Sequence, residues 1–327
     1  MIIRSRKPVG GSLVWSLRVC GVIALVILLL LNLPKSHDVQ LSHIDLRWLG
    51  WCMLLTLLQL CLEAFVWHWL LSTQGIRYVY PKTLRAYLAS QYLGLVTPGH
   101  VGEFLAAGYI SMETGITFGY ALSSVVMKKI LNWIVVVGFG LWGLQLLGQL
   151  PLLQHVRGHL FVSLAVPVIL AAGIALWVVS LRKLAKKWQR LSPWQIETAE
   201  LYAGLKQLLT TKLVWPLLAT VVSFSLLFVQ LDAVLRALGV ARPFLLMAKI
   251  VSCSRIVARI VPLSVVGFGS KDLAVLGLLT QQGLTPSAGL TVTLLLLICS
   301  YLVTLLLSAI CWWVKPLIVR RAQATNS

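Results

Sequence analysis

The sequence contains little charge, and acidic residues are especially rare. Only 11% of its 327 residues are charged, 59% are hydrophobic, and 9 Asp plus Glu stand against 28 Lys plus Arg. This composition excludes a water-soluble globular domain and predicts an all-α polytopic membrane protein. We attribute the net charge of +19 to basic residues in cytoplasmic loops, so we expect no nucleic-acid partner.

The sequence also lacks the motifs of common enzymes and metal sites. It has no HExxH, GxSxG, P-loop or DxD-like acidic pair, and its 6 cysteines lie singly without CxxC spacing. Such cysteines are typical of inert, buried thiols. No small-x-small cleavage site closes the first apolar run, so we expect an uncleaved first span. We expect no enzymatic activity, no metal and no cofactor.

Six apolar stretches are long enough to span a bilayer core, which takes about 20 residues. If the spans alternate and both termini are cytoplasmic, the basic clusters share one side, including Lys128-Lys129 before the third span. We therefore predict a multi-pass protein of the bacterial inner membrane. Residues 182–212 would form a cytoplasmic connector with an interfacial or, alternatively, a partner-docking helix. The six stretches are roughly residues 13–33, 48–73, 130–150, 160–181, 213–238 and 290–314.

Two further apolar stretches, residues 84–112 and 244–279, are interrupted by proline and glycine. A single crossing by either would put later basic clusters on the wrong side, so each must enter and leave on one side. They could be re-entrant helical hairpins or pairs of extra spans. The breaks favour hairpins, because freed backbone groups are tolerated at membrane depth only inside protein or beside a wet cavity.

The two halves of the sequence resemble each other. Pro98 and Pro262 lie 164 residues apart, and the short runs that follow them are alike. Each half, 1–158 and 159–327, would hold three spans and one hairpin, and an odd number of spans inverts the second copy. We therefore predict six full transmembrane helices plus two re-entrant hairpins in an inverted repeat. Secondary transporters use this architecture to place a substrate site near the midplane.

Four acidic residues are predicted at membrane depth, where a carboxylate costs roughly 2.5–3.5 kcal/mol on insertion scales. Glu63 and Asp232 are 169 residues apart, as are Glu103 and Asp272. For the first pair we favour a structural role, with a partner little more than one helical turn further on. For the second pair, beside the breaks, structural and functional roles are both open. The partners of the first pair would be His68 and Arg236.

The second hairpin is rich in basic residues. Arg255 and Arg259 share a helix face at i, i+4 spacing, and Lys249 and Lys271 lie on either side of them. Fixed positive charge beside a helix break favours an anionic ligand, because Arg binds phosphate oxygens in pairs and helix N-termini add donors. Alternatively, Lys249 and Arg255 extend to the lipid headgroups. In the first hairpin, His100 could be a hydrogen-bonding cap, a phosphate ligand or a proton carrier, and we favour the first two.

Residues 98–103, Pro-Gly-His-Val-Gly-Glu, resemble the P-x-R-x-G-E motif of the lysylphosphatidylglycerol synthase transmembrane family. His100 stands where this family has Arg, and Asp272 where it has Glu. The resemblance implies a flippase-like membrane domain that moves polar lipids between leaflets. Because the chain ends soon after its last span, we expect a stand-alone membrane domain without the synthase domain. The family's second motif, P-x(n)-G-x-G-x-[RK]-E, is matched by Pro262, Gly267, Gly269, Lys271 and Asp272.

We therefore expect a transporter that moves a polar, phosphate-bearing membrane lipid or lipid-linked glycan between leaflets. One alternative is a membrane-embedded transferase that acts on a lipid carrier, with Glu103 or Asp272 as general base. Another is a non-transporting partner of an envelope lipid or glycan synthase. The expected headgroup site consists of Pro98, His100, Gly102, Glu103, Arg255, Arg259, Pro262, Gly267, Gly269, Lys271 and Asp272, with support from Glu63 and Asp232.

Overall fold

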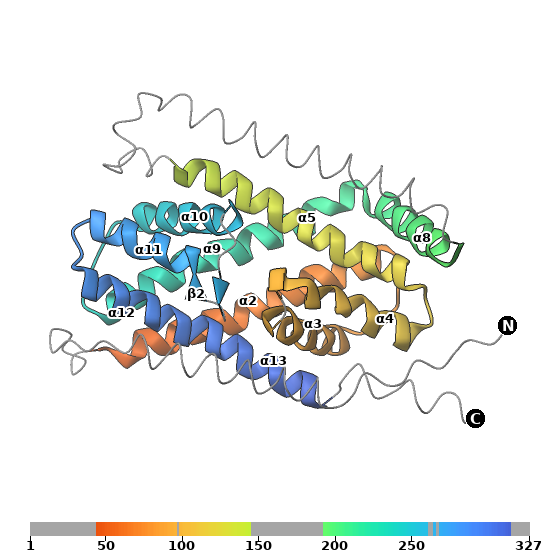
Figure 1. The fold of residues 1–327 in the computed structure, drawn as a ribbon, viewed down its shortest axis with the longest axis horizontal. Helices are drawn as coiled ribbons and strands as arrows, with labels where there is room; N and C mark the ends of the chain where they lie inside the picture. The colour runs from red at the N-terminus through yellow and green to blue at the C-terminus, as the bar shows by residue number, and fades with distance from the viewer. Residues whose placement is uncertain (1–43, 97, 145–191, 261–263, 266–267, 315–327) are drawn as a thin grey trace.

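A computed structural model describes residues 44–96, 98–144, 192–260, 264–265 and 268–314 (Figure 1). Their regular secondary structure is helical, apart from one antiparallel ladder of two-residue strands. The predicted spans at 13–33 and 160–181, Pro262, Gly267 and the boundary between the two predicted halves lie outside the described residues.

The elements differ in type as well as in length: η2 and η4 are 3-10 helices, η5 is a π-helix, and all other helices are α-helices. In chain order they are α2 (Leu46–Thr73), α3 (Tyr80–Val96), η2 (Pro98–Leu105), α4 (Ala106–Thr114), α5 (Phe118–Gly143), α8 (Ser192–Leu208), η4 (Thr211–Leu213), α9 (Val214–Ala237), α10 (Phe244–Ile260), β1 (Ser264–Val265), β2 (Phe268–Gly269), α11 (Ser270–Gln281), α12 (Pro286–Leu296), η5 (Leu297–Leu302) and α13 (Val303–Val314).

Four described helical stretches are long and apolar enough to cross a membrane: α2, α5, α9 and Pro286–Val314, which joins α12, η5 and α13. Three of them agree with predicted spans. The fourth, α5, begins twelve residues before the predicted span at 130–150. Lys128 and Lys129 therefore lie inside this helix, and their assignment to a cytoplasmic loop is wrong. An apolar helix can hold two lysines there because each meets a carboxylate.

Both interrupted stretches fold as helix–break–helix units. In hairpin 1, defined as Tyr80–Thr114, the chain folds back so that Gly102 packs against the backbone of Leu93. In hairpin 2, defined as Phe244–Gln281, α10 packs on α11, and the strands between them pair Ser264 with Gly269. Their re-entry into a bilayer stays a prediction, as does the arrangement of six spans plus two hairpins.

The described elements occur twice in the same order: a long helix, a hairpin and a second long helix. Four glycines with positive φ mark equivalent points in this order. Gly75 and Gly239 follow α2 and α9, whereas Gly115 and Gly283 follow α4 and α11. Only glycine adopts this backbone conformation without strain, so the same residue type ends corresponding helices. The division at residue 158 and the inversion of the second half stay predictions.

Each hairpin packs against a long helix from the other half of the chain (Figure 1). α5 packs along α10 of hairpin 2, and α13 packs along α3 of hairpin 1, while α2 and α9 lie side by side. Buried apolar side chains form two main clusters, one around each hairpin. This exchange of partners brings the broken end of each hairpin towards the middle of the bundle (Figure 1).

The predicted connector helix exists as α8 and packs on α5. The amide of Gly119 donates a hydrogen bond to the Glu197 carboxylate, and a Cβ at Gly204 would overlap Ser123. Ile196 and Tyr202 remain exposed at 62% and 71%. One face of α8 therefore docks on the bundle, and its position at a membrane surface stays a prediction.

Candidate functional site

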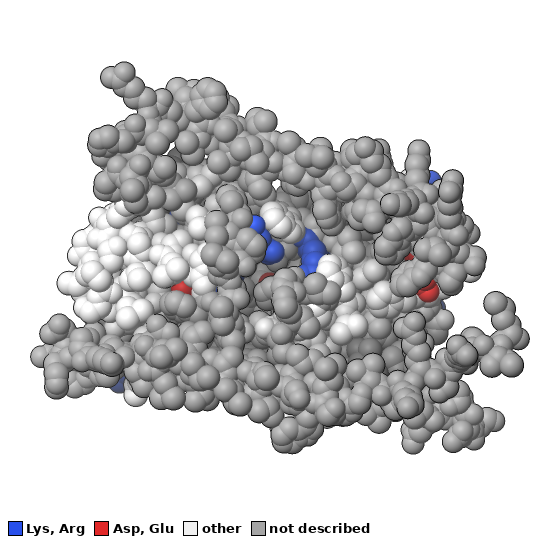
Figure 2. All heavy atoms as spheres, in the orientation of Figure 1, with Lys and Arg blue, Asp and Glu red and all other residues white. Residues whose placement is uncertain are grey.

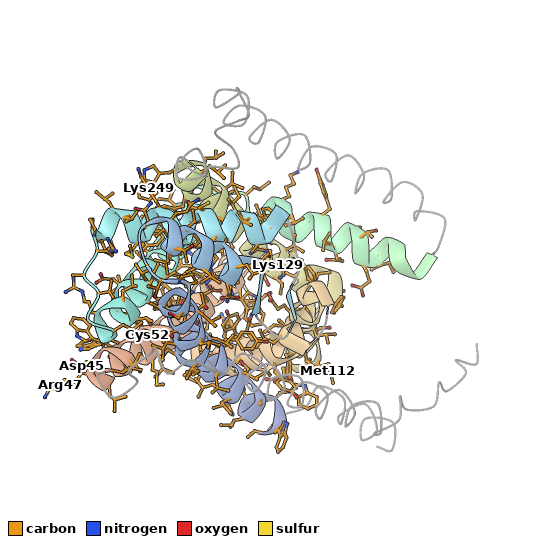
Figure 3. The ribbon with its side chains drawn as sticks, turned by 60° about the vertical axis from the view of Figure 1, so that its left-hand side comes forward. Asp45, Arg47, Cys52, Met112, Lys129 and Lys249 are labelled. Carbon is orange, nitrogen blue, oxygen red and sulfur yellow. The ribbon has the colours of Figure 1, made fainter. Side chains whose placement is uncertain are left out.

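Two adjacent lysines of α5 bind carboxylates from two other elements. Lys128 Nζ lies 2.9 Å from Glu63 Oε2 of α2, and Lys129 Nζ lies 2.7 Å from Glu103 Oε2 of η2. Successive residues on a helix point in different directions, so one Lys-Lys pair can reach two partners. α5 thereby joins the first long helix to the broken end of hairpin 1. Figure 3 shows Lys129 in the interior of the bundle.

The Lys128–Glu63 pair is enclosed by a third side chain. The Tyr87 hydroxyl donates to the same Glu63 oxygen at 3.0 Å, and Lys128 Nζ lies 3.8 Å from the centroid of the Tyr87 ring. Charge-assisted hydrogen bonds and cation–π contact both stabilise a lysine away from water. Because Tyr87 belongs to α3, this group of three holds hairpin 1 against α2 and α5. Its charges cancel, which indicates a structural role.

The Lys129–Glu103 pair has the more exposed lysine and depends on close packing of the backbone. The Lys129 and Glu103 side chains are 30% and 20% exposed, against 15% and 24% for Lys128 and Glu63. A Cβ at Gly94 would lie 2.5 Å from Glu103 Cγ, and one at Gly102 would collide with the Leu93 carbonyl. Gly102 is thus needed for the close approach of η2 to α3, which positions Glu103.

In hairpin 2, Asp272 closes the start of α11. It lies in the first turn of the helix, where its Oδ2 accepts a hydrogen bond from the Gly269 amide at 3.0 Å. An acidic side chain at this position is favourable because the helix N-terminus carries partial positive charge. Asp272 is only 4% exposed, and Lys271 Nζ lies 3.8 Å from its Oδ1. Asp272 therefore stabilises the start of α11 and partly neutralises the charge of Lys271.

Arg255 and Arg259 bring positive charge from α10 towards the same region. Arg255 lies within electrostatic range of Asp272, Arg259 and Glu63. Arg259 lies within range of Glu103 and Glu63, and its guanidinium is 4.9 Å from the centroid of the Trp133 ring of α5. The contact with Trp133 ties the end of α10 to α5, and Arg259 is close enough to Glu63 of α2 and Glu103 of hairpin 1 to be influenced by their charge. Arg255 lies among these charges. Lys249 lies nearer the N-terminal end of α10, over the Trp142 ring.

We call this group of side chains the central charge cluster. Five are basic and three are acidic, so its described residues have more positive than negative charge. Figure 2 shows Lys and Arg atoms in a recess near the middle of the viewed face, in the region between α10 and hairpin 1 of Figure 1. The members are Glu63, Glu103, Lys128, Lys129, Arg255, Arg259, Lys271 and Asp272.

Several predicted site residues lie elsewhere or outside what the structure describes. Pro98 and His100 lie in η2, with side chains outside the described set, and Pro262 and Gly267 are outside it altogether. Asp232 bonds Arg236 at 2.8 Å, as expected. That pair is near the end of α9, and the Arg236 side chain is 48% exposed.

Two expectations about Glu63 were wrong. Its expected partner His68 instead contacts Thr83 at 3.3 Å, while Lys128 and Tyr87 bind Glu63. Nor do Glu63 and Asp232 occupy equivalent positions. Glu63 lies ten residues before the end of α2, and Asp232 five residues before the end of α9.

Sequence reasoning missed four contributors to the central charge cluster and its surroundings: Tyr87, Lys128, Lys129 and Trp133. A signal for the two lysines does exist, since the stretch from 118 to 143 is apolar on both sides of them. The aromatic residues gave no comparable signal, because their roles depend on which helices become neighbours. Among the residues that the structure describes, no group of His, Cys, Asp and Glu could hold a metal ion.

A small cleft with several ionisable residues in its lining lies beside α3, α4 and α13, away from the central charge cluster. Burial raises the pKa of the Tyr78 hydroxyl, which lies in the segment between α2 and α3, and the nearby Glu113 carboxylate raises it further. Tyr78 is therefore a neutral donor at neutral pH. The cleft is lined by Tyr78, Lys82, Arg85, Ala86, Ala89, Tyr109, Glu113 and Cys311.

A family model described as the lysylphosphatidylglycerol synthase TM region matches residues 14–308. The chain belongs to this family. The match confirms the resemblance carried by the two short motifs. With the four long apolar helices, it supports a multi-pass membrane protein, and family membership is consistent with a lipid-related role. No curated protein and no solved structure matches the chain.

Proposed function

We propose that this protein moves a polar, phosphate-bearing lipid or lipid-linked glycan between the leaflets of a bacterial inner membrane. The observation that carries the proposal is the central charge cluster. It joins both hairpins and two long apolar helices, and its basic side chains outnumber its acidic ones. Ionisable side chains at membrane depth generally mark a substrate or ion pathway.

In this proposal, the headgroup binds between the hairpins while the acyl chains stay in lipid. Arg255 and Arg259 would hold phosphate oxygens, and Lys271 would add a third cation. Lys129 and Glu103 form the most exposed acid–base pair of the cluster, so this contact would change as hairpin 1 moves. The less exposed Lys128–Glu63 pair would stay closed. Alternating movement of the two halves would then open the cluster to each leaflet in turn, as in other transporters with broken helices.

Translocation in reconstituted vesicles tests the proposal. Vesicles would contain the purified protein and a trace of anionic phospholipid labelled on an acyl chain. An impermeant reductant bleaches the outer leaflet only, so continued loss of signal measures translocation. We expect Glu103→Gln and Lys271→Ala to slow it at least about tenfold, which corresponds to about 1.4 kcal/mol.

Lys249→Ala is the matched control, because Lys249 is also a hairpin 2 lysine but lies outside the central charge cluster. Wild-type rates in both Glu103→Gln and Lys271→Ala would overturn the proposed site. Turnover of a lipid and a donor by the purified protein would instead favour a transferase. Absence of both activities in folded protein would favour a non-transporting partner of a synthase.

A further inference from the structure

Two arginines of hairpin 2 have no salt-bridging carboxylate among the residues that the structure describes. Among the described residues, each carboxylate of the central charge cluster already faces a lysine: Glu63 faces Lys128, Glu103 faces Lys129, and Asp272 faces Lys271. Neither Arg255 nor Arg259 has a described carboxylate within salt-bridge distance. The positive excess of the cluster is thus located on these two side chains.

The surroundings compensate only part of this charge. The Trp133 ring lies under the Arg259 guanidinium, and its electron-rich face attracts a cation. Arg255 receives longer-range attraction from Asp272 and Glu63, but both of these carboxylates are engaged by lysines. Arg255 is partly buried and Arg259 is exposed. An anionic ligand can therefore reach both guanidinium groups and supply the counter-charge that no described carboxylate gives them.

The geometry of the two arginines fits phosphate. Residues at i and i+4 on a helix have Cβ atoms about 5–6 Å apart, so both side chains can reach one group of atoms. Each guanidinium has parallel N–H donors that match two oxygens of a phosphate. A terminal phosphate or a diphosphate offers enough oxygens and charge for both arginines. A phosphodiester between two alcohols carries a single charge and fewer free oxygens.

We propose that the headgroup taken up by the central charge cluster carries two negative charges on phosphate oxygens, as a phosphomonoester or diphosphate, and that Arg255 and Arg259 select for it. This rests on the proposed function for the claim that the ligand is a lipid. A zwitterionic headgroup would leave the positive excess in place. A cationic, aminoacylated headgroup would add to it, and like charges in a low-dielectric site repel each other strongly.

Binding to the purified full chain in neutral detergent tests this selectivity. The lipids would be phosphatidic acid, phosphatidylglycerol and lysyl-phosphatidylglycerol with identical acyl chains, compared by native mass spectrometry at pH 8. At this pH the phosphomonoester is a dianion, since the second phosphate pKa is about 6. We expect phosphatidic acid to bind about tenfold more tightly than phosphatidylglycerol, and the lysylated lipid to bind least tightly.

Substitutions then locate the selectivity. Arg255→Gln and Arg259→Gln should each reduce the preference for phosphatidic acid severalfold, and the double variant should remove it. Lys249→Gln, on the same helix but outside the cluster, should keep the wild-type ranking. Equal binding of all three lipids by the wild type would overturn the proposal even if a variant fails to fold. An unchanged ranking in the folded double variant would also overturn it.

Two further comparisons distinguish a lipid ligand from free phosphate, and selective binding from transport. Inorganic pyrophosphate should displace phosphatidic acid only at much higher concentration, and displacement at equal concentration would show that the ligand is not a lipid. Selective binding without translocation would count against transport but leave the charge selectivity standing. Translocation that ignores headgroup charge would support transport and overturn the selectivity.

Discussion

The two hairpins have the same place in the element order but carry different charges. Hairpin 1 presents Glu103, which Lys129 neutralises from outside the hairpin. Hairpin 2 presents Lys271 and Asp272, which face each other, together with two arginines that have no described carboxylate partner. The difference indicates a division of work within one cluster. Hairpin 1 is tied to α5 by the Lys129–Glu103 ion pair, whereas hairpin 2 would supply the charge for a ligand in the proposed function.

The largest effect should come from breaking the enclosed ion pair beside hairpin 1. Removing one partner of a buried ion pair generally costs about 3–5 kcal/mol, because the other charge is left without compensation. Lys128→Met should therefore lower the free energy of unfolding in mixed micelles by about 3 kcal/mol, since the pair is not fully buried.

The control for this experiment is the double variant Lys128→Met with Glu63→Gln. It should be more stable than the sum of the two single effects predicts, because no uncompensated charge remains. Strict additivity of the two substitutions would show that the Lys128–Glu63 contact does not stabilise the protein.

A smaller loss of stability should follow when the close approach inside hairpin 1 is blocked. A Cβ at Gly102 would collide with the Leu93 backbone, so Gly102→Ala must push η2 away from α3. Overpacking of this kind costs about 1–3 kcal/mol. We expect Gly102→Ala to lower the unfolding midpoint and, by displacing Glu103, to slow lipid translocation.

Gly277 of hairpin 2 offers the matched control, because a Cβ there meets nothing within 4 Å. Gly277→Ala should leave translocation unchanged and stability unchanged or slightly higher, since glycine inside a helix is unfavourable by roughly 0.5–1 kcal/mol. Equal damage by both substitutions would remove the distinction between the two sites.

The smallest effect is expected at the exposed acid–base pair of α9. Arg236 and Asp232 are four residues apart on one helix, and pairs of this kind contribute about 0.3–0.5 kcal/mol. Arg236→Gln should therefore change the unfolding free energy by less than about 1 kcal/mol and leave translocation intact. A large loss of translocation would place Asp232 in the transport site after all.

Much of the fold could be predicted from the sequence because it depends on local signals. Long apolar runs predicted α2, α9 and Pro286–Val314, and the proline and glycine breaks predicted both helix–break–helix units. The same kind of signal misled us at α5, where Lys128 and Lys129 resembled the end of a span. A charge inside an apolar helix is tolerated when a partner from another helix meets it, and one-dimensional patterns do not contain that information.

For the candidate site, too, local signals predicted some residues but not the contacts between helices. Glu103, Arg259, Lys271 and Asp272 were predicted from their position beside the breaks. Their partners were not, because Lys129 reaches Glu103 only after α5 has packed against hairpin 1. Pairing acids by sequence offset also failed for Glu63, since the corresponding helices end at different distances from the two carboxylates.

The central claim is that the central charge cluster is reached from both sides of the membrane in turn. Ser270, at the start of α11 beside Lys271, can be replaced by cysteine with little change in size, in a protein whose native cysteines are replaced. Ser72→Cys, at the exposed end of α2, is the control and should react from one side only. We predict that an impermeant thiol reagent labels Ser270→Cys from either side of oriented vesicles, and that phosphatidic acid slows the labelling. Labelling of Ser270→Cys from a single side under all conditions would contradict the account.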